Sequence, residues 1–133
     1  TPNLPEAEAI SGMQVTKKEE MRPVAEKIIA LGAKAVLVKG GHLSDTADDL
    51  LFDGQQEKWF AGERIATKNT HGTGCTLSSS LAANLAKGLS LEEAVQASKA
   101  YVTEAIAHGI ALGSGCGPTH HFVDLYRKAG ILD

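Results

Sequence analysis

The residues best suited to chemistry in this sequence lie in the stretch THGTGCTLSSSLAANLAKG, residues 70–88. Gly72, Thr73 and Gly74 precede Cys75, and the small and apolar residues that follow predict a helix. A helix start leaves about four backbone N–H groups without intrahelical partners and carries about half a positive charge. Glycines just before it let the backbone approach a ligand closely. The stretch therefore predicts an anion site suited to phosphate, where the helix dipole favours a thiolate at Cys75.

Other interpretations of this loop stay open. In the plainest one, the two glycines form a tight turn and Cys75 is a small buried hydrophobe. In another, Cys75 is the nucleophile of a hydrolase and His71 its base, although no acyl-enzyme signature surrounds the cysteine. The pairs His71-x3-Cys75 and Cys116-x3-His120 come near zinc-site spacing without matching it. A P-loop does not fit, because no Lys-Ser/Thr pair follows the glycines.

Composition narrows the classes of protein. The 133 residues are enough for one domain, with 43% hydrophobic and 22% charged residues. A net charge of -3, without Lys/Arg clusters among aromatic residues, argues against nucleic acid as a partner. No apolar run approaches the ~18 residues of a membrane span, and two cysteines make no disulfide framework, so we expect a cytoplasmic protein. The opening TPNLPEAEAI has no initiator Met, and we expect a piece of a longer protein.

The elements expected before the loop begin with two helices. A helix is predicted over residues 5–11, since Pro5 suits a first helical position. A second helix follows a capping-box pattern of Thr16 and Glu19. The apolar run 35–38 predicts a buried strand, expected to be parallel because a helix has just returned the chain.

The remaining elements complete an α/β pattern. Short antiparallel strands are expected around the turn at Asp53 and Gly54. Ser90 and Glu93 form a second capping-box pattern, which opens a long helix predicted to continue to about residue 112. A glycine-rich loop and a short C-terminal helix follow. This order of elements predicts helices packed on a mostly parallel sheet.

Four segments of the chain carry a family resemblance: TPNLPEAEAISG, AVLVKGGH, THGTGCTLSSSLAANLAKG and GSGCGPTHHF. In their sequence and order they resemble the C-terminal half of the hydroxymethylpyrimidine and phosphomethylpyrimidine kinases of thiamine biosynthesis. These kinases are members of the ribokinase-like superfamily. The resemblance covers essentially all of residues 1–133 and implies half of a single kinase domain, a three-layer α/β/α sandwich. It implies ATP-dependent phosphorylation of 4-amino-5-hydroxymethyl-2-methylpyrimidine and then of its monophosphate. Most of the pyrimidine pocket would lie in the absent N-terminal half.

The resemblance also assigns residues near the start of the chain. Asn3 and Glu6 match an Asn-x-x-Glu motif that acts on magnesium and the nucleotide phosphates, which makes Glu6 the implied metal residue. Lys39 and Gly41 match a nucleotide-binding turn. From the residues alone, dipole complementarity would also place Glu6 at a helix start, and Lys39 would be a surface lysine with a buried stem.

A second group of implied site residues lies in the C-terminal part. Residues 72–75 match the anion-hole loop, and Cys75 stands where most sugar kinases of the superfamily carry an Asp as catalytic base. The loop bordering the adenine matches at Gly113, Gly115 and Gly117. His120 departs from the Asn expected at its position, so the resemblance assigns it no role.

The expected ligands are ATP, magnesium and a small pyrimidine, with a second copy of the chain in a homodimer. Neither nucleic acid nor a membrane is expected as a partner. Two alternatives remain: a pyridoxal kinase of the same superfamily, and a nucleotide-binding fragment without catalysis.

Overall fold

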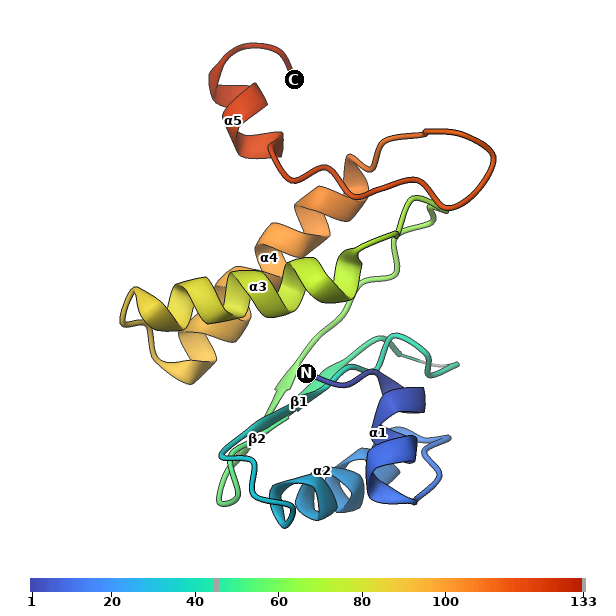
Figure 1. The fold of residues 1–133 in the computed structure, drawn as a ribbon, viewed down its shortest axis with the longest axis vertical. Coiled ribbons are helices and arrows are strands. Elements are labelled where there is room, and N and C mark those ends of the chain that lie inside the picture. Colours follow the sequence, from blue (N-terminus) through green and yellow to red (C-terminus); the bar gives the residue numbers. More distant parts are fainter. Residues whose placement is uncertain (45, 133) are drawn as a thin grey trace. The chain divides into compact units, whose positions relative to one another are not determined.

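The computed structural model describes residues 1–44 and 46–132, and the chain divides into two compact units. Unit 1 is Thr1–Arg64 and unit 2 is Ile65–Asp133. Figure 1 shows the order of their helices and strands along the chain. Unit 1 contains both helices and a sheet, which confirms the α/β class expected from the sequence.

Unit 1 contains α1 (Leu4–Ser11), the 3-10 helix η1 (Lys18–Glu20), α2 (Met21–Ile29), β1 (Val36–Val38), β2 (Asp49–Phe52) and β3 (Glu57–Phe60). The predicted helix over 5–11 is confirmed as α1. Its start is fixed by a capping box, in which Asn3 Oδ1 accepts the Glu6 N–H and Glu6 Oε2 accepts the Asn3 N–H, each at 2.8 Å. Gly12 ends the helix in the left-handed conformation, with φ 71°.

The capping box predicted for Thr16 and Glu19 is wrong by one residue. The Thr16 N–H and hydroxyl both donate to Glu20 Oε2, at 2.7 and 3.0 Å. The cause is η1, a tighter turn that precedes α2 and moves the accepting carboxylate one position along the chain. Pro23 then falls in the first turn of α2, where its missing N–H would have had no helical partner.

The sheet of unit 1 has the order β1-β2-β3, and both pairs are antiparallel. The mostly parallel sheet expected from the sequence is therefore not found in the described residues. The reason is the connection after β1: it carries no crossover helix, and the chain returns directly as β2, which makes an antiparallel neighbour. Parallel pairing is limited to two isolated bridges, one in each unit, between Asn3 and Lys39 and between His71 and Pro118.

The predicted turn between β2 and β3 is confirmed. Asp53 Oδ1 accepts the N–H groups of Gln55 and Gln56, at 2.9 and 2.7 Å, and Gly54 has φ 92°. An Asp that binds the following backbone and a glycine in the left-handed region are the two requirements of such a tight turn.

One hydrophobic core holds unit 1 together. The stripe Met21, Val24, Ala25 and Ile28 follows helical spacing, so one face of α2 is buried against the sheet. The core residues are Leu4, Ala7, Val15, Met21, Val24, Ala25, Ile28, Val36, Val38, Leu43, Leu50 and Phe52.

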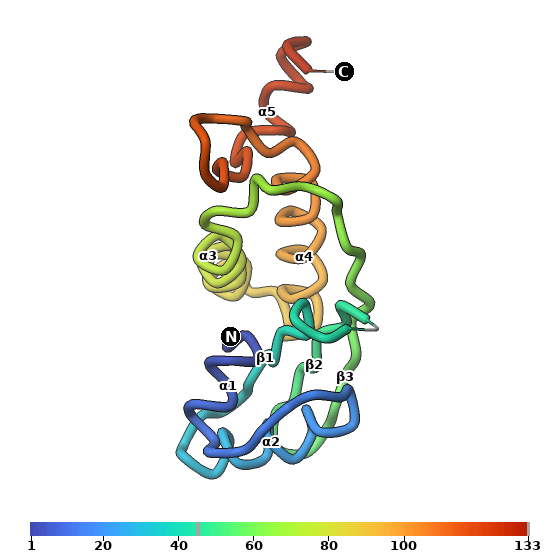
Figure 2. The backbone as a smooth tube through the Cα atoms, turned by 90° about the vertical axis from the view of Figure 1, so that its right-hand side faces the viewer, coloured from blue at the N-terminus to red at the C-terminus, as the bar shows by residue number. Residues whose placement is uncertain are grey.

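Unit 2 consists of α3 (Thr73–Ala86), α4 (Leu91–Ala107), α5 (Val123–Lys128) and the loops between them. The helices α3 and α4 pack side by side (Figures 1 and 2). The Ser90–Glu93 capping box is confirmed at the start of α4. The helix ends at Ala107, earlier than predicted, because the chain turns at Gly109, where a Cβ atom would meet Asn69. No helix of the described residues is long and apolar enough to cross a membrane.

Candidate functional site

The start of α3 has the backbone geometry that the sequence predicted for an anion site. Gly72 precedes the helix with φ 85° and gives it no side-chain cap. The carbonyl oxygen of Gly72 accepts both the N–H and the hydroxyl of Thr76, at 2.9 and 2.8 Å. Thr73 is occupied as well, since its N–H and hydroxyl reach the Thr70 carbonyl oxygen at 3.3 and 2.7 Å.

Two donors of this first turn remain available. Within the described part of the chain, no acceptor binds the N–H groups of Gly74 and Cys75. The Cys75 side chain is exposed rather than buried, which removes the interpretation of this residue as a core hydrophobe. Free N–H groups beside the positive end of a helix and an exposed thiol can bind a phosphate and accept a proton from a neighbouring hydroxyl.

The glycine-rich loop before α5 is joined by backbone hydrogen bonds to His71, directly before the start of α3. His71 pairs with Pro118 in a parallel bridge: the His71 N–H donates to Gly117 O at 3.1 Å, and the Thr119 N–H donates to His71 O at 3.3 Å. The loop predicted to bind phosphate and the loop that the resemblance assigns to adenine are thus joined by backbone hydrogen bonds. Gly113 and Gly115 are exposed and have no neighbouring atom where a Cβ would lie, whereas Gly117 is buried.

Asn69 holds both ends of this glycine-rich loop, and the sequence analysis did not single it out. Its Nδ2 donates to Gly109 O at 3.3 Å, and its side chain occupies the space where a Cβ of Gly109 or Gly117 would lie. Asn69 Oδ1 is buried without a partner among the described residues. The only local signal was a polar residue two positions before His71. The side-chain contacts of Asn69 with Gly109 and Gly117 lie 40 or more residues away in the sequence, so no local pattern reveals them.

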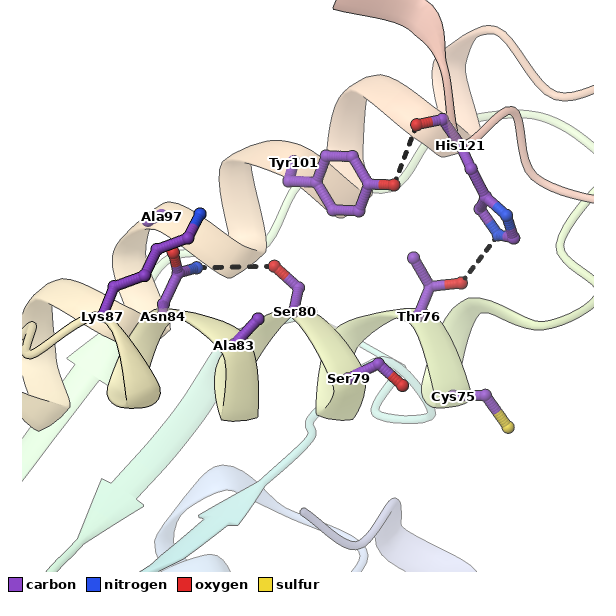
Figure 3. Close-up of a pocket in the computed structure, with 10 residues that line it drawn as sticks. All are labelled: Cys75, Thr76, Ser79, Ser80, Ala83, Asn84, Lys87, Ala97, Tyr101 and His121. Carbon is purple, nitrogen blue, oxygen red and sulfur yellow. Dashed lines mark hydrogen bonds between the residues drawn. The ribbon is translucent and has the colours of Figure 1, made fainter.

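An open pocket of about 640 Å³ runs along α3 from its first turn to its C-terminal end, between α3, α4 and His121 (Figure 3). Polar groups from all three elements face it, and Cys75 lies at one end of the α3 side while Lys87 lies at the other. The residues that line it are Cys75, Thr76, Ser79, Ser80, Ala83, Asn84, Lys87, Ala97, Tyr101 and His121.

The remaining site residues predicted from the sequence lie in unit 1, where the fold brings three of them together. Asn3 and Lys39 form a parallel bridge, in which the Lys39 N–H donates to Pro2 O at 2.9 Å. Glu6 lies one turn into α1, exposed, with Oε2 on the Asn3 N–H. Gly41 is exposed, with open space around its Cα atom. The capping box gives Glu6 a structural role in addition to any role with a metal.

The structure offers little for a zinc site. Among residues 1–44 and 46–132, no three His, Cys, Asp or Glu side chains cluster so that they could hold a metal ion. Both cysteines are free thiols. A hydrolase with His71 as base is equally without support, because His71 is bound through its backbone to the glycine-rich loop and no side-chain contact links it to Cys75.

Comparison with known proteins identifies the family. The family model described as phosphomethylpyrimidine kinase matches residues 1–120. The chain belongs to the phosphomethylpyrimidine kinase family. It is 47% identical over 121 residues to a hydroxymethylpyrimidine/phosphomethylpyrimidine kinase of Streptomyces coelicolor, and 52% identical over 126 residues to that of Rhizobium meliloti. These matches cover 91% and 92% of this chain.

A solved structure agrees with this assignment at the level of the fold. The ADP complex of Bacillus subtilis pyridoxal kinase aligns with 93% of this chain at a TM-score of 0.86 and 41% identity. The chain covers 48% of that protein, and 45% and 47% of the two curated relatives. It therefore spans about half the length of the relatives it matches.

Proposed function

We propose that this chain is the C-terminal half of an ATP-dependent kinase of thiamine biosynthesis. The enzyme phosphorylates 4-amino-5-hydroxymethyl-2-methylpyrimidine and then converts the monophosphate into the diphosphate. The observation that carries the proposal is the first turn of α3, where two backbone N–H groups have no acceptor among the described residues and lie beside an exposed thiol. Membership of the phosphomethylpyrimidine kinase family supports the choice of substrate.

The loop of residues 72–75 stabilises the transferring group in this proposal. An in-line transfer of a phosphoryl group spreads negative charge over three oxygen atoms, and catalysis depends on donors placed where that charge develops. The N–H groups of Gly74 and Cys75 are such donors. Gly72 and Thr73 form the turn that directs them, and the adenine extends towards Gly113, Gly115 and Gly117.

Cys75 accepts the proton of the substrate hydroxyl in the first reaction. The nucleophile of this step is a CH2–OH oxygen, whose proton must leave as the bond to phosphorus forms, and a thiolate beside the anion site can take it. In the second reaction the nucleophile is a phosphate oxygen that is already ionised. The second phosphorylation therefore depends less on Cys75 than the first.

Asn3, Glu6, Lys39 and Gly41 bind the nucleotide phosphates and their magnesium ion in this proposal. Magnesium typically takes one or two protein carboxylates and completes its coordination with phosphate oxygens and water. The exposed carboxylate of Glu6 fits this requirement, because only its Oε2 atom is occupied by the Asn3 N–H. Bound magnesium would neutralise charge on the phosphates. Glu6 holds the metal side, and Lys39 contributes a positive charge for the phosphates.

The wider assignments belong to the same proposal. The 133 residues form the C-terminal half of one kinase domain, whose complete fold is a ribokinase-like three-layer sandwich with a mostly parallel sheet. The kinase is cytoplasmic and acts as a homodimer, without nucleic acid or membrane as partner. Light scattering on the full-length protein tests the homodimer by its mass.

A pyridoxal kinase is the second candidate. It is favoured by the similarity to the Bacillus subtilis pyridoxal kinase, at a TM-score of 0.86. The deciding experiment measures kcat/KM of the full-length protein for hydroxymethylpyrimidine, its monophosphate and pyridoxal, with ATP and magnesium. The proposal requires both pyrimidines to be better substrates than pyridoxal. A preference for pyridoxal selects the second candidate, and nucleotide binding without turnover of any substrate selects a non-catalytic role.

A further inference from the structure

His121 lies between the glycine-rich loop and α5, and both its ring and its backbone are bound to other elements of unit 2. Its Nε2 atom lies 3.1 Å from Thr76 Oγ1 on α3 and 3.3 Å from Thr119 Oγ1. Its carbonyl oxygen accepts the Tyr101 hydroxyl of α4 at 2.9 Å (Figure 3). The side chain is exposed, yet its position is fixed from two sides.

The hydrogen bonds around Thr76 determine which ring nitrogen of His121 carries a proton. Gly72 O can only accept, so the contact of 2.8 Å between it and Thr76 Oγ1 requires the hydroxyl hydrogen to lie between them. A hydroxyl has one hydrogen, and Thr76 Oγ1 therefore acts as an acceptor towards His121. The hydrogen of the 3.1 Å contact must belong to Nε2. Thr119 Oγ1 shares it at the longer distance of 3.3 Å.

We infer that His121 is a positioning residue for the anion loop, acting through Thr76 on Gly72. Its Nε2–H holds the Thr76 hydroxyl, and that hydroxyl holds the carbonyl oxygen of the residue before α3. The inference rests on the proposed kinase function of this loop and goes beyond it, since it gives His121 a role that neither the resemblance nor the comparisons assign to it.

The anion loop needs this support because, in the part of the chain that the structure describes, no side chain of the N-cap residue caps the helix. Gly72 has no side chain, and α3 begins without the side-chain cap that Asn3 gives α1 and Ser90 gives α4. The direction of the N–H groups of Gly74 and Cys75 depends on the orientation of the peptide unit at Gly72. A misplacement of about 1 Å in such a site can cost on the order of 10²-fold in rate.

Two substitutions separate the hydrogen bond from the mere presence of a side chain. The amide nitrogen of Gln reaches the position of Nε2, whereas the shorter Asn places its amide near Nδ1. We expect His121→Gln to keep kcat within about threefold of the value for the unsubstituted full-length protein. His121→Asn should lower kcat about tenfold, which is less than the loss on the order of 10²-fold that a misplacement of about 1 Å can cause. KM for ATP should change less than kcat, because the loop acts mainly on developing charge.

The neighbouring residue provides a matched control pair. His120 Nδ1 accepts the Phe122 N–H, and its ring contacts Tyr126, so it does not reach α3. His120→Gln and His120→Asn should therefore differ from each other by less than twofold. Equal activities of His121→Gln and His121→Asn in folded proteins would overturn the inference.

A measurement on the unsubstituted full-length protein tests the inference without relying on turnover. Two-bond 15N–1H NMR correlations distinguish the two neutral tautomers of a histidine ring, and we expect the Nε2–H form at His121. The Thr76→Val variant should weaken this preference, since it removes the nearer of the two acceptors of Nε2–H. An Nδ1–H ring in the unsubstituted protein overturns the inference whatever the activity. If no substrate is phosphorylated but the Nε2–H form is found, the kinase function fails while the contact that positions the loop stands.

Discussion

The two units of the chain differ in how they hold their residues in place. Unit 1 surrounds Leu50 and Val38, both fully buried, with side chains from two helices and a sheet. In unit 2, the buried apolar side chains lie mainly along the contact between α3 and α4. The large exposed hydrophobic residues of unit 2 are Leu85, Tyr101, Ile110, Leu112, Phe122, Leu125, Tyr126 and Ile131, against Ile10, Met13 and Leu31 in unit 1.

The difference follows from the elements present. A sheet offers an extended apolar face, and α2 covers it with a continuous stripe. The helices of unit 2 have no strand to pack on among the described residues. Its loops are held instead by hydrogen bonds, from Asn69, His71 and Thr76, and these loops carry the proposed chemistry. Substitutions should therefore affect stability most in unit 1 and activity most in unit 2.

The largest expected effect is on activity in unit 2. Cys75→Ala should lower the rate of the first phosphorylation by about 10²–10⁴-fold, the usual size of a general-base contribution. The second phosphorylation should fall less, and ATP affinity should hardly change, because the donors of the anion loop are backbone groups. Initial rates with each pyrimidine, together with calorimetry of ATP binding, provide the comparison.

Cys116→Ala is the matched control for this prediction, since Cys116 is the other exposed free thiol of the chain. It should change either rate by less than threefold. Small and equal losses of rate in both reactions for Cys75→Ala would show that Cys75 is not the base. Residues 72–75 would then contribute to catalysis only through their backbone N–H groups.

The next effect is on stability in unit 1. Leu50→Ala leaves a cavity at a fully buried position and should lower the free energy of unfolding by about 3–5 kcal/mol. Leu81→Ala in α3, where the side chain is 8% exposed, should cost about 2 kcal/mol, at the low end of the range for buried leucines. Within residues 1–133, Trp59 is the single Trp and both tyrosines, Tyr101 and Tyr126, lie in unit 2, so urea unfolding of this chain can follow each unit separately.

Equal costs for Leu50→Ala and Leu81→Ala would contradict the contrast between the units. Coincident shifts of the Trp59 and tyrosine transitions in both variants would show that the units unfold as one, and the comparison of their cores would then lose its meaning.

A feature of the fold or of the candidate site could be predicted from the sequence when the residues that determine it lie close together along the chain. The capping box of α4 follows from residues three positions apart, and the position of α1 follows from Pro5; both were predicted correctly. The turn at Asp53 and Gly54 is equally local. The antiparallel pairing of residues 35–38 with β2 was not predicted, because such an apolar run is the same in a parallel and an antiparallel sheet.

The candidate site shows the same limit. The glycines and Cys75 of the proposed anion loop stand together in the sequence, so a local pattern was enough to propose them. Asn69 was not singled out and no positioning role was foreseen for His121, since the groups they hold lie 40 and 45 residues away. Such residues acquire a role only when the chain has folded, and a single sequence gives no signal for them.

A smaller effect is expected in the glycine-rich loop. A Cβ at Gly117 would meet the Ile110 carbonyl oxygen and the Asn69 side chain, so Gly117→Ala should displace the loop and lower stability by about 1–3 kcal/mol. Gly115→Ala has open space and should leave stability within about 0.5 kcal/mol. Thermal unfolding measures both. If ATP lies against this loop, Gly115→Ala should still weaken its binding in calorimetry, whereas unchanged binding would place the adenine elsewhere.

The smallest effect concerns an ion pair of unit 1. Lys18 Nζ lies 2.7 Å from Asp48 Oδ2 and 4.4 Å above the Trp59 ring. The Lys18 ammonium, helped by the N–H of Gly62 and the Thr46 hydroxyl, lowers the pKa of Asp48 from 3.8 to about 2. A lowered carboxyl pKa stabilises the folded state above the pKa of the unfolded chain, and this contribution is lost as the pH falls from about 4 towards 2.

Asp48→Asn should therefore lower the free energy of unfolding at pH 7 by about 0.5–1 kcal/mol, a value reduced by solvent because the Lys18 side chain is 38% exposed. The difference from the unsubstituted protein should shrink as the pH falls from about 4 towards 2, and it should also shrink in 1 M salt. Trp59 fluorescence during urea unfolding at several pH values measures it. In unit 2, Glu104→Gln removes the exposed pair with Arg127 and should cost less than about 0.5 kcal/mol. A larger cost for Glu104→Gln than for Asp48→Asn would mean that charges, unlike apolar contacts, stabilise unit 2 more than unit 1.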